Sequence, residues 1–176
     1  PPLVTHHVPP QAHGERHVMH KVLRGFAQVT AITLEPQVSA DVRGDLRVVL
    51  SSGVQHVLDL GITCPATPAR VNGAMRTHKT PGAAAEAYDK IKQDKYDRAG
   101  VPNAVPFIVE TGGRFSESTR RFVDEVLVDR AQPGDLLVAH KLFRQICWNL
   151  LDHNAYCMSK LTQELAIPDL AAAPAA

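Results

Sequence analysis

The chain has 176 residues, of which 44% are hydrophobic and 21% are charged, and this suffices for one globular domain with a buried core. Its formal net charge of +1 excludes a strong overall attraction to nucleic acid, so any such binding needs local basic patches. The three cysteines form no C-x-x-C pair, which argues against a disulfide framework or a zinc knuckle and favours a reducing compartment.

The N-terminal residues 1–13 are rich in proline and histidine and predict a flexible arm or linker. One domain is expected over 14–165, followed by a low-complexity, disordered tail at 166–176. Because the chain begins with Pro-Pro and not with methionine, we expect a piece of a longer polypeptide. No signal peptide is visible, and no apolar run reaches the roughly 20 residues that span a bilayer, so we expect an intracellular protein that is neither secreted nor membrane-embedded.

The first predicted helix covers about residues 14–28, where apolar residues recur at helical spacing. His13, His17 and His20 lie at positions i, i+4 and i+7 of this segment. Such a spacing can present imidazoles to a zinc ion, although histidines that simply lie on a helix surface are the commoner case.

A strand is predicted at 29–35 and is followed by a tight β-hairpin. Two apolar runs, 45–50 and 54–63, flank a Ser-Ser-Gly loop of the length that commonly connects hairpin strands, with the glycine at positive φ. If Leu50 pairs with Val54, the register places Asp45 directly opposite Asp59, with Cβ atoms about 5 Å apart.

Two facing carboxylates cost stability, so this pair calls for a compensating cation. Carboxylate oxygens are hard ligands that suit Mg²⁺ or Mn²⁺. The alternative is that one aspartate lies at a frayed strand end and the other is solvated on an open face of the sheet.

A long connection with three prolines follows the hairpin, over about residues 64–82. Its basic side chains either belong to a solvated loop or follow a phosphate backbone. On the second interpretation the candidate DNA-binding residues are Arg70, Arg76 and Lys79.

Residues 82–97 give the clearest helical pattern. At about 100° per residue, one face is predicted to be buried and the opposite face, which includes Asp89 and Lys90, to be exposed. The residues that define the buried face are Ala84, Tyr88 and Ile91.

Lys92 and Lys95 break this pattern, because both fall toward the predicted core side of the same helix. Lysines at a helix edge can extend their ammonium groups back to water. Two lysines near a carboxylate pair can instead neutralise it, position a water nucleophile or stabilise a phosphorane-like transition state.

An apolar run at 105–112 is typical of a central strand, but Glu110 interrupts it. A buried glutamate needs a partner, and the lysine pair is a candidate. Ser116 is predicted to cap the next helix, which Pro133–Gly134 ends, and a last helix is expected over about 135–165.

The predicted order is helix, strand, strand, strand, helix, strand, which indicates an α/β core with a mixed sheet. Within it, Arg43-Gly44-Asp45 followed by Asp59, with thirteen residues between the aspartates, resembles the first half of the PD-(D/E)xK nuclease signature. Gly44 replaces the usual proline, and Gly61 stands where the signature lysine is expected. In the restriction-enzyme-like endonuclease domains of non-LTR retrotransposons that lysine is replaced by a K-x-x-K-Y motif on the following helix, and residues 92–96 match it.

The surrounding segments LDLGITCP, TPGAAA and VPFIVETGG are also similar to C-terminal domains of retroelement polyproteins related to reverse transcriptases, and the resemblance covers about residues 16–130. It implies a restriction-endonuclease-like core with additional C-terminal helices over 135–165. It further implies target DNA and the reverse transcriptase domain of the same polyprotein as partners, and a nuclear location if the element is eukaryotic.

The activity implied by this resemblance is that of a metal-dependent DNA nickase, whose nick supplies the 3′ end that primes reverse transcription. Asp45 and Asp59 would hold Mg²⁺ or Mn²⁺, which polarises the scissile phosphate and activates water. Lys92 or Lys95 would assist the water or stabilise developing charge, and Tyr96 would pack or hydrogen-bond beside them. The candidates for supporting residues around the site are Glu110 and His17.

Two other functions fit the same residues. One is a catalytically inactive remnant that binds nucleic acid or acts as a scaffold, using the basic segment 70–79 and no metal. The other is a junction-resolving nuclease with the same core, which would prefer branched over linear duplex DNA.

Overall fold

The computed structural model of the chain describes residues 18–38, 42–66 and 80–164, with side chains to residue 155. Residues 18–23 are helical, and the named elements follow in chain order. They are β1 Val29–Leu34, β2 Leu46–Leu50, β3 Gln55–Thr63, α3 Ala83–Arg98, β4 Ala104–Glu110, α4 Glu117–Arg121, the π-helix η2 Phe122–Leu127, and α5 Pro133–Glu164.

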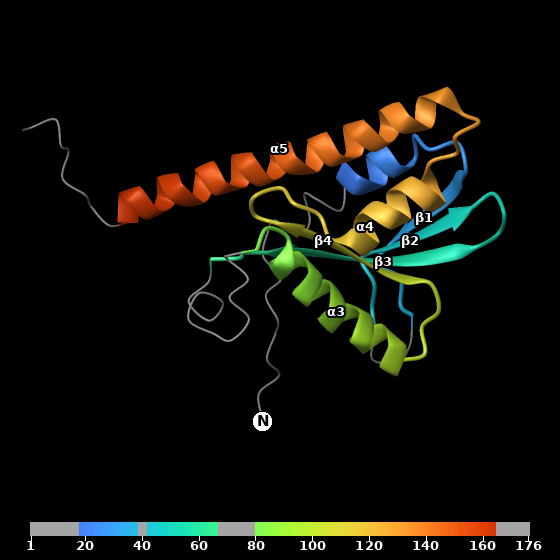
Figure 1. The fold of residues 1–176 in the computed structure, drawn as a ribbon, viewed down its shortest axis with the longest axis horizontal. Coiled ribbons are helices and arrows are strands. Elements are labelled where there is room, and N and C mark those ends of the chain that lie inside the picture. The colour runs from blue at the N-terminus through green and yellow to red at the C-terminus, as the bar shows by residue number, and fades with distance from the viewer. Residues whose placement is uncertain (1–17, 39–41, 67–79, 165–176) are drawn as a thin grey trace, which may run out of the picture.

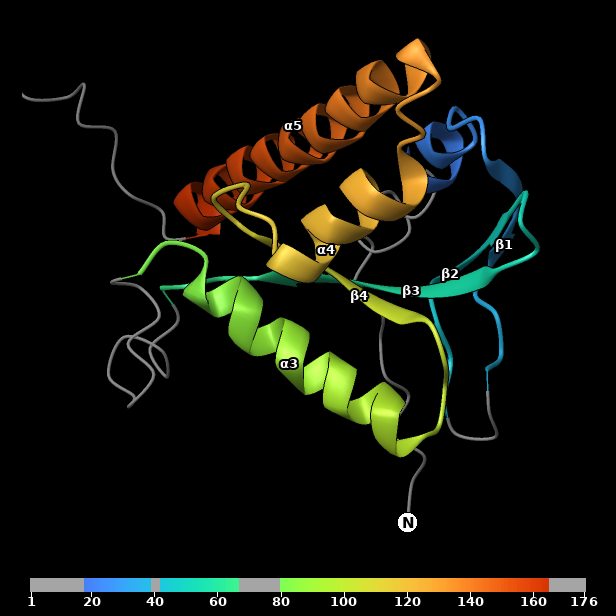
Figure 2. The same cartoon turned by 45° about the vertical axis from the view of Figure 1, so that its right-hand side comes forward.

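The four strands form one mixed sheet in the order β1-β2-β3-β4. The β1–β2 and β2–β3 pairs are antiparallel, while β3 and β4 are parallel and joined through α3. Helix α3 lies on one face of the sheet, and the helix at 18–23, α4 and α5 lie on the other (Figures 1 and 2). The predicted α/β class with a mixed sheet is therefore confirmed.

The hairpin has the predicted register. Leu46 pairs with Leu58, the backbone N–H of Leu50 donates to the carbonyl of Val54 at 2.9 Å, and Gly53 adopts a φ of 83°. Regular pairing stops at Leu46, however, because the N–H of Asp45 also donates to the carbonyl of Leu58, at 2.9 Å. Asp45 therefore leaves the ladder and is not a regular cross-strand partner of Asp59.

Two hydrophobic clusters cover the two faces of the sheet. The larger one joins the sheet to the helix at 18–23, η2 and α5, and the smaller one joins β3 to α3. The smaller cluster consists of Val42, Val57, Tyr96 and Val101. It holds the C-terminal half of α3 against the strand that carries Asp59.

Several local expectations are wrong. Ile91 is 59% exposed, whereas Asp89 is buried and accepts a hydrogen bond from the Ser118 hydroxyl. The helix that Ser116 caps ends at Leu127, well before Pro133, which begins α5.

Some predictions fall on residues outside the described ranges. They concern the arm at 1–13, the tail at 166–176, two of the three spaced histidines and the candidate DNA-binding residues, namely His13, His17, Arg70, Arg76 and Lys79. Within the described ranges, no helix combines the length and apolar character that crossing a bilayer requires.

Candidate functional site

The two lysines of α3 converge on Asp59, in the middle of β3. The ammonium Nζ of Lys92 lies 2.5 Å from Asp59 Oδ1, and that of Lys95 lies 3.7 Å from Oδ2. Asp59 itself is only 7% exposed. One buried carboxylate is therefore compensated by two cations that lie more than 30 residues further along the chain.

Asp45 reaches the same place through the backbone of β3. Its Oδ2 accepts a hydrogen bond of 2.8 Å from the N–H of Leu60, the residue after Asp59. Regular pairing of β3 with β2 has ended at this point, so the Asp45 side chain takes the place of a backbone acceptor from β2. The carboxylate of Asp45 is thus fixed beside the segment that holds Asp59.

The hydroxyl of Tyr96 lies among these groups, on a side chain that is fully buried. It donates to the backbone carbonyl of Arg43 at 3.2 Å, and Asp59 and Asp45 are near enough for their charges to act on it. Burial raises the pKa of Tyr96 well above its usual range, and the negative charges of Asp59 and Asp45 raise it further. The phenol therefore keeps its proton, which it donates to the Arg43 carbonyl beside the acidic pair.

The two lysines differ in their environments. Lys92 has 13% of its side chain exposed, donates to the carbonyl of Leu60 at 2.9 Å and lies 5.3 Å from the centre of the Tyr88 ring. Lys95 has 46% exposed and lies 5.0 Å from the centre of the Tyr96 ring. Lys92 is therefore held in place from several sides, while Lys95 faces solvent at the mouth of the cluster.

Gly61, where the nuclease signature has lysine, lies directly under α3. A Cβ at this position would lie 2.7 Å from Tyr88 Cε1, 2.7 Å from Ile108 Cδ1 and 3.3 Å from Lys92 Cε. The space that a side chain at position 61 would need is already filled by Tyr88 and Lys92 from the helix. Gly44 is equally constrained, since a Cβ there would lie 2.4 Å from Val57 Cγ1.

Glu110 caps the start of α3, which is a different role from the predicted pairing with Lys92 and Lys95. From the end of β4 its carboxylate accepts hydrogen bonds from the first N–H groups of α3, at 3.1 Å from Ala84 and 3.2 Å from Ala85. The helix begins after Gly82, which has no side chain to cap it. A carboxylate at a helix N-terminus satisfies free donors and complements the helix dipole. Glu110 therefore anchors the helix that carries Lys92, Lys95 and Tyr96.

Sequence reasoning missed a second set of polar contacts, which attaches α4 to β4 on the outer edge of the sheet. Thr119 Oγ1 accepts the N–H of Ile108 at 2.8 Å, and Ser118 bonds both Asp89 and the carbonyl of Pro106. These bonds satisfy backbone groups that an edge strand would otherwise leave free. The Ser-x-Ser-Thr run at 116–119 indicates side-chain hydrogen bonds near a helix start, but the sequence does not show that their partners lie in β4 and α3.

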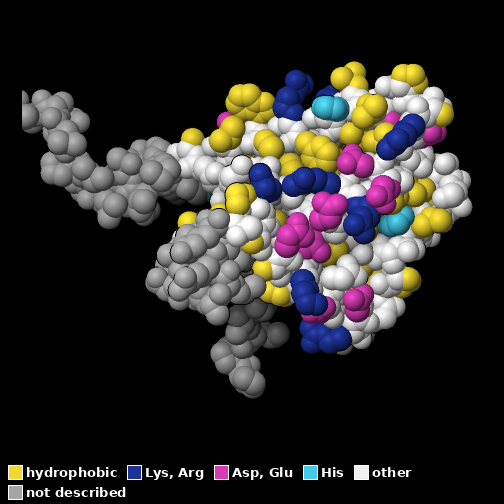
Figure 3. Space-filling model, in the orientation of Figure 1, with side chains coloured by type: hydrophobic (Ala, Val, Ile, Leu, Met, Phe, Trp, Pro, Cys, Tyr) yellow, Lys and Arg dark blue, Asp and Glu magenta, His cyan; other side chains and the backbone are white. Residues whose placement is uncertain are grey.

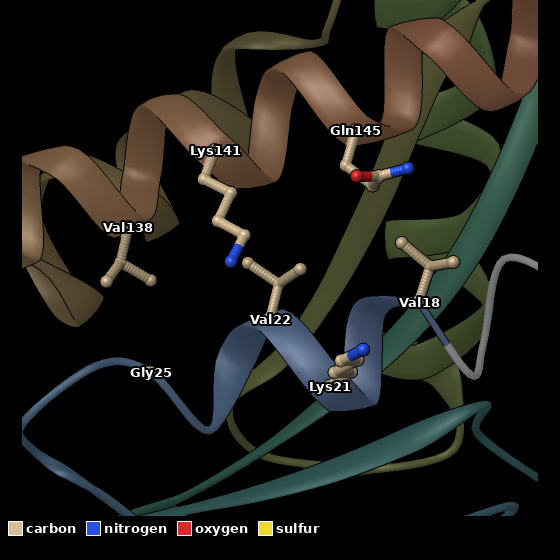
Figure 4. A pocket seen from close by; sticks show the side chains of 7 residues that line it. All are labelled: Val18, Lys21, Val22, Gly25, Val138, Lys141 and Gln145. Carbon is tan, nitrogen blue, oxygen red and sulfur yellow. The ribbon is translucent and has the colours of Figure 1, made fainter.

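Two hollows lie away from the acidic pair. One, of about 320 Å³, lies between the helix at 18–23 and α5, with valines on its walls and Lys21 and Lys141 beside them (Figure 4). The other, of about 220 Å³, contains His56, whose ring packs edge-on to Phe122 at 5.2 Å. Burial lowers the pKa of His56, and its Nδ1 has no hydrogen-bond partner within the described part of the chain.

The donor set around Asp59 is composed of oxygens of the kind that a divalent cation prefers. It comprises the carboxylates of Asp45 and Asp59 and the carbonyl of Leu60, and the Lys92 ammonium contacts two of these groups. Among the described residues no group of three or more His, Cys, Asp or Glu side chains could hold a metal. A cation here would have to use the backbone carbonyl and compete with Lys92.

The chain matches no protein-family model, and it matches no curated protein at a significant level.

Proposed function

We propose that this chain is a divalent-metal-dependent DNA endonuclease, a nickase domain of a retroelement with a restriction-endonuclease-like core. The observation that carries the proposal is the contact of Lys92 and Lys95 with Asp59. The K-x-x-K-Y motif and the aspartate motif are distant in sequence, and a nuclease site of this type requires them to meet. The order of three antiparallel strands, a crossover helix and a parallel fourth strand is compatible with this core.

Asp45, Asp59 and the carbonyl of Leu60 are the groups that would hold Mg²⁺ or Mn²⁺. When bound, such an ion polarises a phosphoryl oxygen and lowers the pKa of a water molecule. The described part of the site supplies no third carboxylate, so water and the phosphate of the DNA would complete the coordination of the ion.

The remaining roles follow from exposure and hydrogen bonding. Lys92 is restrained by the Leu60 carbonyl and is placed to donate to an attacking water beside Asp59. Lys95, half exposed at the mouth, is placed to contact the phosphate of an incoming strand. Tyr96 keeps its proton and, through its bond to the Arg43 carbonyl, ties α3 to the segment that carries Asp45. Glu110 supports the site through the N-terminus of α3, without contact to the aspartates.

The test is nicking of supercoiled plasmid by the purified chain with Mg²⁺ or Mn²⁺. We expect nicking to disappear in EDTA and in Asp59→Asn and Lys92→Met. The matched control is Asp94→Asn on the exposed side of α3, which removes a carboxylate of the same helix from a surface pair with Lys90 and should leave nicking unchanged. Metal-independent cutting, or cutting that survives Asp59→Asn, would contradict the proposal.

A second candidate is a catalytically inactive remnant of the same fold, which binds nucleic acid or acts as a scaffold. The observation that favours it is that the two lysines already neutralise Asp59, so the cluster is stable as a structural ion network. Calorimetric titration separates the candidates. Mg²⁺ or Mn²⁺ binding that is lost in Asp45→Asn favours the nuclease, whereas DNA binding without any metal binding favours the remnant.

Target DNA and the reverse transcriptase domain of the same polyprotein are the partners in this proposal, and a nuclear location follows if the element is eukaryotic. A junction-resolving nuclease remains a variant of it. Nicking assays on branched and linear duplexes of equal length distinguish the two, since only a resolving enzyme should prefer the branched DNA.

A further inference from the structure

Helix α5 has a second apolar face that points away from the core. Its inner face packs through Ala139, Leu142, Ile146 and Leu150, all of which are buried. On the opposite face Leu137 is 74% exposed, Trp148 57% and Leu151 57%. In Figure 3 hydrophobic side chains lie along the upper margin of the molecule, where Figure 1 shows α5, with basic side chains between them.

The spacing of this outer face is regular. Steps of four and three residues connect six positions, which at about 100° per residue span a stripe roughly 80° wide. Alternating steps of four and three residues are typical of a helix that packs against another helix along its length. The six residues of this outer stripe are Leu137, Lys141, Arg144, Trp148, Leu151 and Ala155, all of them exposed.

We propose that the outer stripe of α5 pairs with the outer stripe of a second copy of this chain, with the two helices antiparallel. A two-fold contact requires a surface that is complementary to itself. The stripe meets this condition: pairing about its midpoint brings Leu137 against the partner's Ala155, and Lys141 against the partner's Leu151. Arg144 then lies against the partner's Trp148, where a guanidinium stacks favourably on an indole.

Charge complementarity identifies the second copy, rather than an unrelated apolar helix, as the occupant. Asp152 is exposed and lies on the same flank of α5 as Lys141. In the antiparallel pair each Lys141 lies next to the partner's Asp152, so the contact contains two such ion pairs. An unrelated apolar helix would leave the two cations of the stripe without partners.

The position of Lys141 at the edge of the stripe allows its side chain to reach Asp152 of the second copy. Lys141 is exposed at the edge of the stripe and also lines the hollow against the helix at 18–23, where Val138 and Val22 form the wall (Figure 4). Its four-carbon side chain is long enough to turn from the hollow to the partner's flank. This inference is independent of the nuclease proposal, because no residue of the acidic site takes part in it.

The first experiment is sedimentation of the full chain over about 1–100 µM, with reducing agent present so that cysteine cross-links do not contribute. We expect the mass to rise from 19.1 kDa toward twice that value. Trp148 is the single tryptophan, so its emission should shift to shorter wavelength over the same concentrations. Trp148→Glu should remain monomeric. Ile91→Glu replaces a comparably exposed apolar residue on α3 and should dimerise like the natural chain.

A charge exchange tests the geometry. Lys141→Glu should weaken dimerisation by about tenfold, and Lys141→Glu combined with Asp152→Lys should restore it. Within one helix these residues are about 16 Å apart, further than the range of screened surface charges, so a rescue must come from the second copy. Circular dichroism checks that each variant folds. A chain that stays monomeric throughout, a dimer insensitive to Trp148→Glu, or a double variant no better than Lys141→Glu would overturn the proposal.

Discussion

Asp45 is fastened to the strand of Asp59 by one hydrogen bond, in which the N–H of Leu60 donates to Asp45 Oδ2 at 2.8 Å. The same residue, Leu60, offers its carbonyl to the Lys92 ammonium at 2.9 Å. The backbone of Leu60 in β3 thus bonds both to the segment before β2, through Asp45, and to α3, through Lys92. The acidic pair is held together by the backbone, and not by regular strand pairing.

This arrangement predicts different outcomes for two substitutions of Asp45. Asp45→Ala leaves the Leu60 N–H without an acceptor and should lower the free energy of unfolding by about 1–3 kcal/mol. Asp45→Asn keeps an acceptor oxygen and should lower it by less than about 1 kcal/mol, while it removes the charge that metal binding requires. Urea unfolding measures the first effect and calorimetric titration with Mn²⁺ the second. Equal destabilisation by both variants would contradict the role of this hydrogen bond.

The buried pair of Lys92 and Asp59 should be strongly coupled. Lys92→Met leaves Asp59 with only the more distant Lys95 and should cost about 3 kcal/mol, because an uncompensated buried charge remains. Asp59→Asn on top of Lys92→Met removes that charge and should recover at least about 1 kcal/mol.

The exposed pair of Lys90 and Asp94 on the same helix provides the matched control for this double-mutant cycle. These side chains are 77% and 52% exposed and 3.4 Å apart, so their coupling energy should be below about 0.5 kcal/mol. Both cycles are read from urea unfolding. Equal coupling energies would contradict the inference that burial makes the Lys92–Asp59 interaction stronger than a surface ion pair.

The register of the hairpin could be predicted because its determinants are local. A Ser-Ser-Gly loop with Gly53 at positive φ fixes which residues pair, and the pairing of Leu46 with Leu58 follows from it. The direction of Lys92 and Lys95 could also be predicted, since helical periodicity alone places them on the side of α3 that faces β3. These two local rules bring the residues of the candidate site together.

The hydrogen-bond partners of several buried carboxylates come from other elements of the fold, and the periodicity of one helix or strand cannot predict them. Asp89 was expected on the exposed face but is buried, because the Ser118 hydroxyl of α4 lies over it. The lysine pair is the candidate partner of Glu110 in the sequence, whereas in the structure the N–H groups of Ala84 and Ala85 at the start of α3 donate to its carboxylate. Asp135 had no predicted role, yet its carboxylate accepts the N–H groups of Ala27 and Asp129, at 3.0 Å each.

Tyr96 should make stability depend on pH in the alkaline range. Burial and the neighbouring aspartates raise its pKa in the native state, so folding favours the protonated phenol. The resulting stability is fully present below a pH of about 10, the pKa of tyrosine in an unfolded chain, and is lost as the pH rises beyond it.

Unfolding in urea between pH values of about 8 and 11 should therefore show a steeper fall for the natural chain than for Tyr96→Phe. Lysine deprotonation is common to both proteins and cancels in the comparison. Tyr88→Phe, which alters a half-buried tyrosine of the same helix, should keep the steep fall. A parallel pH dependence in the natural chain and Tyr96→Phe would contradict the proposed environment of this hydroxyl.

Gly61 should tolerate no side chain, because α3 occupies the space above it. In Gly61→Ala the new methyl would lie 2.7 Å from both Tyr88 Cε1 and Ile108 Cδ1, so at least one of them must move. Overpacking of this kind typically costs about 1–3 kcal/mol. Because the Lys92 ammonium lies 5.3 Å from the centre of the Tyr88 ring, a shift of this ring should disturb the contact of Lys92 with Asp59, and nicking should fall further than the loss of folded protein explains. Gly112→Ala is the control, since a Cβ there would meet nothing within 4 Å. Unfolding midpoints and nicking rates of the two variants measure both effects, and a Gly61→Ala chain as stable and active as Gly112→Ala would show that α3 does not press on this position.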